Sequence, residues 1–145
     1  TPGLSIPDNI PAGVFDTFAP DNVAPLVDLD RLAAERGNAG AQFNVGALHF
    51  AGVAVPKNQA EAAKWFRRAA DQGHIGGQVY LALSYATGLG VPQDNVQAYA
   101  WLSVAAAGGD KDAIGNRNRI APKMTPAQIA EAQKLAREWK SKPER

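Results

Sequence analysis

The sequence predicts an all-α solenoid, a fold in which similar pairs of helices stack along one axis. Three observations predict it. A block of 36 residues occurs twice in succession, a Gly-containing turn that ends in Val-Pro divides each block, and apolar residues recur at helical spacing on both sides of that turn. The chain has 145 residues, which is enough for one domain to bury a core without disulfides.

The repeat appears when residues 37–72 are aligned on residues 73–108 without gaps. Ten positions are identical, and most of them are Gly, Pro, Trp or Ala, residue types that fix turns or allow close packing. The identical pairs are Gly37 and Gly73, Gly40 and Gly76, Gln42 and Gln78, Gly52 and Gly88, Val55 and Val91, Pro56 and Pro92, Ala62 and Ala98, Trp65 and Trp101, Ala69 and Ala105, and Ala70 and Ala106.

Each repeat is predicted to form two helices. In the first repeat, a helix over Ala39–Ala51 is followed by the Gly-Val-Ala-Val-Pro turn at 52–56 and by a second helix over about 60–72. The second repeat follows the same plan. Shifting the period back by 36 residues places a half-repeat, a lone helix of the second type, at 29–36.

Residues 109–140 are predicted to form helices that cap the open end of the stack. Thr125 and Gln128 have the spacing of a capping box, with Pro126 at the first helical position. The helix that follows is amphipathic, and we expect Trp139 to anchor it on the second helix of repeat two. The terminal elements of a solenoid differ from its inner repeats because one of their faces meets solvent.

Residues 1–28 differ in kind from the repeats. Five prolines argue against a long helix, whereas the segment is too apolar for a simple disordered tail. We therefore expect an extended, Pro-rich segment that docks on its own solenoid or on another chain.

The two ends of the chain carry opposite charge. Residues 1–30 hold five acids and no bases, a net charge of −5, and residues 111–145 hold nine bases and four acids, a net charge of +5. End-to-end self-association between molecules is one consequence that this pattern allows. Lys64, Arg67 and Arg68 form a small basic patch that we expect to be solvated.

Composition excludes several classes of function. A net charge of +1 provides no bulk field that would attract nucleic acid, and no apolar run approaches the roughly 20 residues of a membrane span. The absence of cysteine excludes disulfides, Cys-based metal sites and thiol catalysis. The only histidines, His49 and His74, lack metal-ligand spacing, so we expect no metal or cofactor. We expect His49 to lie in the core or in the groove, in place of a packing aromatic residue, and His74 to be exposed.

These repeats resemble the Sel1-like repeat family, relatives of the tetratricopeptide repeats. The stretches that carry the resemblance in repeat one are 37–46, 52–56 and 62–73, and the likeness extends over about residues 29–140. It implies a right-handed α-α superhelix whose first helices build a concave face. It also implies a non-catalytic adaptor, and because many bacterial members are exported, it favours the periplasm or cell envelope.

The first helix of each repeat is apolar on nearly all sides, and the second helix can cover only one side. By analogy with tetratricopeptide geometry, the uncovered positions would form an apolar groove on the concave face. Either residues 1–28 or a separate partner segment could fill it. The predicted groove residues are Phe43, Ala47, Phe50, Val79, Leu83 and Thr87.

The leading functional hypothesis is therefore a scaffold that binds a protein or peptide through this groove. One alternative is an envelope module that contacts peptidoglycan or another glycan through Tyr80, Tyr99 or Trp139. A second alternative is an enzyme with a cryptic carboxylate site, which the lack of any catalytic motif disfavours.

Overall fold

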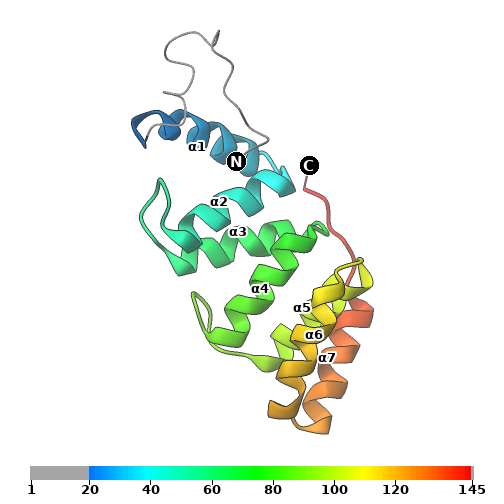
Figure 1. The fold of residues 1–145 in the computed structure, drawn as a ribbon. Coiled ribbons are helices and arrows are strands. Elements are labelled where there is room, and N and C mark those ends of the chain that lie inside the picture. Colours follow the sequence, from blue (N-terminus) through cyan, green and yellow to red (C-terminus); the bar gives the residue numbers. More distant parts are fainter. Residues whose placement is uncertain (1–19, 145) are drawn as a thin grey trace, which may run out of the picture.

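Seven α-helices follow one another in the computed structural model, which describes residues 20–144 (Figure 1). This part of the chain contains no strand, and most helices pack on the next helix in sequence. The predicted all-α solenoid is therefore confirmed. The elements are α1 (Pro20–Glu35), α2 (Ala39–Ala51), α3 (Gln59–Asp71), α4 (Ile75–Thr87), α5 (Asn95–Ala107), α6 (Lys111–Ile120), the 3-10 helix η2 (Ala121–Lys123) and α7 (Pro126–Glu138).

Helix α1 begins earlier than the predicted half-repeat. The sequence predicts an extended segment up to residue 28 and a helix over 29–36, but the helix starts at Pro20. Pro20 fits there because the amide of the first helical residue has no partner within the helix. Pro25 removes one further backbone donor without ending the helix. The docking expected for residues 1–19 lies outside the described residues.

The two repeats have matching helix boundaries and matching caps. Helices α2 and α4 end at left-handed glycines, Gly52 and Gly88. Helices α3 and α5 begin after Asn58 and Asp94, whose side chains each accept a hydrogen bond from the amide three residues later. The 36-residue period of the sequence is thus also a period of the structure.

The main core lies between the helices of the two repeats. Phe66 on α3 is fully buried and lies against Gly46 on α2, where a Cβ atom would come within 2.7 Å of the Phe66 ring. Leu81 on α4 and Trp101 on α5 continue this core, and Trp65 is buried in a second cluster with α1 and α2. Both repeat tryptophans are therefore core residues.

Helix α7 closes the stack by packing on α5. Thr125 and Gln128 make both hydrogen bonds of the capping box that starts α7. At the other end of this helix, the Trp139 ring meets the Trp101 ring edge to face, with 6.2 Å between centroids. Ala132 is fully buried in a small cluster with Tyr99. The predicted closing helix and its tryptophan anchor are therefore confirmed.

Gly90 and Gly115 lie in opposite surroundings. Gly90 has a φ of +80°, and a Cβ atom there would overlap the backbone carbonyl oxygen of Gln59 at the start of α3. Gly115 lies inside α6 with open space around the position of its missing Cβ. Gly90 is required because the turn of repeat two approaches the backbone of repeat one closely. Gly115 lowers helix stability through its backbone entropy, and no close contact requires a glycine there.

We expect Gly90→Ala to lower the free energy of unfolding by about 2–3 kcal/mol, because the side chain is strained at positive φ and meets backbone. Gly115→Ala should raise it by about 0.5–1 kcal/mol, because alanine is the better helix former. Urea unfolding of both variants measures the two changes. Equal effects of the two substitutions would contradict the close approach at Gly90.

Candidate functional site

The C-terminal tail, residues 140–144, runs back along the edge of the solenoid where consecutive repeats join. Figure 1 shows this red segment leaving α7 and passing the corner between α3 and α4 toward the start of α2. The Lys142 amide donates to the Asp71 carbonyl at 2.7 Å, and the Ser141 hydroxyl donates to the Gln72 carbonyl at 2.8 Å. The tail therefore connects the last helix to repeat one.

Glu144 is the main anchor of the tail. Arg68 on α3 donates two hydrogen bonds to its carboxylate, at 2.7 Å from the terminal nitrogen and at 3.2 Å from Nε. Gln42 on α2 adds a third from Nε2 at 3.0 Å. A bidentate arginine contact with an additional amide donor is a strong way to hold a carboxylate.

Gln72 connects the tail to the repeat junction. Its Nε2 donates to the Gly37 carbonyl at 2.8 Å and to Gln42 Oε1 at 2.9 Å. Its Oε1 accepts from the Glu144 amide at 3.2 Å. Gln42 is fully buried, and through these contacts both its amide nitrogen and its carbonyl oxygen are hydrogen-bonded.

The expectation of a solvated basic patch holds for Lys64 and Arg67, which are exposed, but not for Arg68, whose side chain is 37% exposed and pairs with Glu144 of the tail. The hydrogen bond from Arg68 lowers the pKa of Glu144, and the same contact raises the pKa of Arg68. Sequence reasoning missed the tail because an extended segment after a helix has no periodic signal, and its partners lie 69 to 102 residues away.

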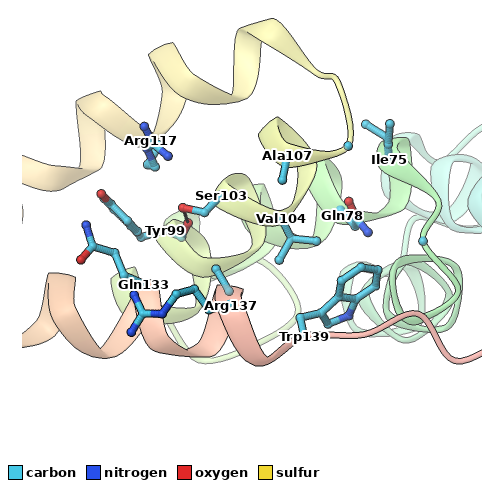
Figure 2. Close-up of a pocket in the computed structure, with 13 residues that line it drawn as sticks. Ile75, Gln78, Tyr99, Ser103, Val104, Ala107, Arg117, Gln133, Arg137 and Trp139 are labelled. Atoms are coloured by element: carbon cyan, nitrogen blue, oxygen red, sulfur yellow. Dashed lines mark hydrogen bonds between the residues drawn. The ribbon is translucent and has the colours of Figure 1, made fainter.

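A hollow of about 670 Å³ lies beside the tail, among α5, α6, α7 and the start of α4 (Figure 2). We call it the α4–α7 pocket. Figure 2 shows Arg117 from α6 on one side, Gln133 and Arg137 from α7 on the other, and Ser103 and Val104 from α5 between them. Its lining consists of Gly73, Ile75, Gln78, Tyr99, Ser103, Val104, Ala107, Gly108, Arg117, Gln133, Ala136, Arg137 and Trp139.

The lining of this pocket is cationic at one end. It includes Arg117 and Arg137, and none of the lining residues is Asp or Glu. The Arg117 guanidinium lies over the Tyr99 ring at 5.5 Å, and its buried Nε has no hydrogen-bond partner among the described residues. An uncompensated guanidinium beside an aromatic ring is suited to an anionic group of a ligand.

The other end of the pocket is apolar and has one unsatisfied acceptor. Ile75 and Trp139 line this end, close to Gln78 (Figure 2). Gln78 is 2% exposed, its Nε2 donates to the Ala70 carbonyl at 3.3 Å, and its Oε1 has no partner among the described residues. This end of the pocket thus has a buried carbonyl oxygen at its lining whose hydrogen-bonding capacity the described residues leave unused.

The structure places four of the predicted groove residues against the core. Phe43 and Phe50 both contact Tyr80 edge to face, at centroid distances of 5.4 and 5.8 Å, and both lie near the Phe66 ring. Their side chains are half-buried. Ala47 and Val79 pack against the same cluster.

The remaining two groove residues face solvent. Leu83 is 41% exposed, and Thr87 is exposed one helical turn further along α4. The Thr87 hydroxyl donates to the Leu83 carbonyl at 2.8 Å. The six residues therefore divide into a packed aromatic side and an exposed edge, and their role in partner binding stays a prediction.

The two histidines, His49 and His74, are both at least partly buried in helix contacts. His49 is buried, as expected, and its Nδ1 has no partner among the described residues. His74 is half-buried rather than exposed, because it caps α4 by accepting from the Gly77 amide at 3.0 Å and stacks on Phe43. Burial lowers the pKa of His74.

The described part of the chain lacks two kinds of feature. None of its helices is both long and apolar enough to cross a membrane. Within the same residues, no group of three or more His, Cys, Asp or Glu side chains could hold a metal ion.

Known proteins resemble this chain in sequence and in fold. The Sel1 repeat family matches residues 39–74 and 76–110. A protective antigen present in uropathogenic Escherichia coli strains, which displays an SLR fold, has a TM-score of 0.81 at 34% identity, over 88% of this chain and 28% of that one. A Sel1 repeat protein from Oxalobacter formigenes has a TM-score of 0.65 at 38% identity, over 69% and 29% respectively. The chain therefore carries two tandem Sel1 repeats and belongs to the Sel1-like repeat family.

This chain spans less than a third of the length of either solved protein. No protein with a curated functional description matches it significantly. Sel1 repeat proteins generally act as scaffolds for protein interactions and are typically non-catalytic.

We expect Glu144→Gln to lower the free energy of unfolding by about 1 kcal/mol at neutral pH, because the charged hydrogen bonds to Arg68 are weakened in a partly exposed site. Urea unfolding measures the change. Glu131→Gln, on the exposed face of α7, is the matched control and should leave stability within about 0.5 kcal/mol. An equal loss in both variants would show that the contact with Arg68 is not the cause.

The same variant tests the pH dependence of tail docking. Because folding lowers the pKa of Glu144, its stabilisation is complete above the pKa of the unfolded chain, roughly 4.3, and is lost as pH falls through the lower pKa of the folded state. The unfolding free energies of the wild type and Glu144→Gln should therefore differ at neutral pH and converge in acid. A difference that persists unchanged into strong acid would contradict the assignment.

Proposed function

We propose that this chain is a non-catalytic scaffold that binds a segment of another protein. Membership of the Sel1-like repeat family supports the general role. The observation that carries the proposal for this chain is the α4–α7 pocket, a hollow of about 670 Å³ that combines an apolar floor with polar groups for which residues 20–144 supply no partner. Apolar hollows with a few placed polar groups are the usual form of a binding site.

The predicted groove on the first helices contributes a second part of the proposed surface. Leu83 and Thr87 are exposed on α4, the helix whose Tyr80 contacts the half-buried Phe43 and Phe50 of α2. A partner segment lying along α4 would cover Leu83, and α4 begins at the α4–α7 pocket. One partner could therefore contact both regions, with the pocket as the more enclosed of the two.

The surroundings of the aromatic residues favour a peptide over a glycan. Sugar binding needs flat, accessible ring faces, whereas Tyr99 is 7% exposed and is covered by Arg117. Tyr80 packs among three phenylalanine rings. Trp139 is half-buried against Trp101. The aliphatic and small residues in the pocket suit the side chains and backbone of a protein segment.

The proposal extends to a bacterial cell envelope or periplasm as the place of action. The two solved relatives come from bacteria. Many bacterial members of the family are exported, which also supports this location. Fractionation of source cells tests this point, with enrichment in the envelope fraction expected and confinement to cytosol contradicting it.

A photo-crosslinking amino acid placed at Ala107 or Leu83 should trap a discrete protein in cells of the source organism, because both positions are exposed on the proposed surface. The same group at Glu131, on the far face of α7, should not trap it. Mass spectrometry of the adduct identifies the partner. A product of twice the chain mass would instead indicate the self-association that the opposite end charges allow. Failure at both surface positions, or equal trapping at Glu131, would contradict the scaffold surface.

A further inference from the structure

Two buried glutamines at the same repeat position provide an internal comparison. Gln42 and Gln78 lie 36 residues apart, and each donates Nε2 to the carbonyl of the residue eight positions earlier, Ala34 or Ala70. Both are at most 2% exposed. The backbone hydrogen bond of the two side chains therefore repeats. Any difference in their hydrogen bonding arises from what surrounds the remaining atom, the carbonyl oxygen Oε1.

Those surroundings differ between the repeats. At Gln42, the carbonyl oxygen accepts from Gln72, and the Glu144 carboxylate binds Arg68 above it. The counterparts 36 residues later are Gly108 for Gln72 and Val104 for Arg68, which provide no side-chain donor. Among the described residues, Gln78 Oε1 consequently has no partner, and it is buried at the lining of the α4–α7 pocket. A buried carbonyl oxygen without a donor is unfavourable unless a ligand supplies one.

The C-terminal tail, which docks at repeat one, indicates what kind of segment could bind beside the corresponding glutamine of repeat two. At repeat one, the Glu144 backbone amide donates to a glutamine Oε1 while its carboxylate binds an arginine. At repeat two, Gln78 Oε1 and the Arg117 guanidinium are the same two kinds of group, and both have unpartnered atoms. The repeat-two pocket therefore contains the same two kinds of group as the site that the tail occupies, but Gln78 is the counterpart of Gln42 and not of Gln72, and its arginine comes from α6.

We propose that the α4–α7 pocket binds an extended segment of a partner protein that carries an acidic side chain. The carboxylate contacts Arg117, with Arg137 nearby, and a backbone N–H donates to Gln78 Oε1. An apolar side chain next to the acid lies on Trp139. The proposal rests on the scaffold function above and specifies its partner, and its basis is charge complementarity, since the lining has two guanidinium groups and no carboxylate.

Fluorescence polarisation with the full chain tests this proposal. The probe is a labelled hexapeptide, acetyl-Val-Phe-Pro-Glu-Ile-Val-amide, whose Pro-Glu pair copies the residues that dock at repeat one and whose only charge is the glutamate. Saturable binding is expected. The matched peptide with Gln in place of Glu should bind about tenfold more weakly or worse, the size of one lost charged hydrogen bond.

Variants locate the site. Arg117→Met keeps an apolar stem over Tyr99 but removes the charge, and it should weaken binding of the Glu peptide about tenfold. Arg119→Met on the same helix is the control, since Arg119 is exposed and outside the pocket lining. Replacing buried Gln78 can unfold the chain, so Ala107→Trp, which fills the pocket from an exposed position, is the second variant and should abolish binding.

Three outcomes would overturn the proposal: no binding of the Glu peptide, equal binding of the Glu and Gln peptides, or binding that Ala107→Trp leaves unchanged. Tighter binding of a Gln peptide with a free C-terminus would also overturn it, because the site would then read a terminal carboxylate. Trapping of a partner at Ala107 or Leu83 without peptide binding would reject this partner chemistry while retaining the scaffold function.

Discussion

Phe66 holds the two repeats together because its ring meets side chains from both neighbouring first helices. It is fully buried on α3, lies near Phe43 and Phe50 of α2, and is 5.3 Å from the Tyr80 ring of α4. Gly46 leaves the space that the ring occupies. Aromatic rings in tilted and edge-to-face contact bury a large area with defined geometry, so this cluster sets how α2, α3 and α4 stack.

This packing also determines where a partner can bind. The aromatic residues of α2 are half-buried in contacts between repeats, and less of their surface is available than the helical pattern indicates. The α4–α7 pocket lies further along the stack. There, α6 and α7 take the place of a third repeat and pack on α5. The irregular end of a solenoid can therefore provide the binding site while the regular repeats provide rigidity.

The tail adds a polar constraint to this apolar scaffold. Through Glu144, Gln72 and Arg68 it connects the closing helix to the first repeat, so both ends of the stack are linked by hydrogen bonds as well as by successive packing. In most solenoids each unit contacts only its neighbours, and such a long-range connection should make the unfolding of this chain more cooperative.

Local signals in the sequence were sufficient to predict the helix pairs and the turns between them, because glycine, proline and apolar spacing act over a few residues. They also predicted the closing helix, since a capping box is local. Three other features depend on the folded arrangement: His74 caps α4, Arg68 pairs with Glu144, and Gln78 lines a hollow together with Arg117. Identical residues at repeat positions, such as Gln42 and Gln78, have different partners because those partners come from distant, non-repeating segments. No periodic pattern encodes such contacts.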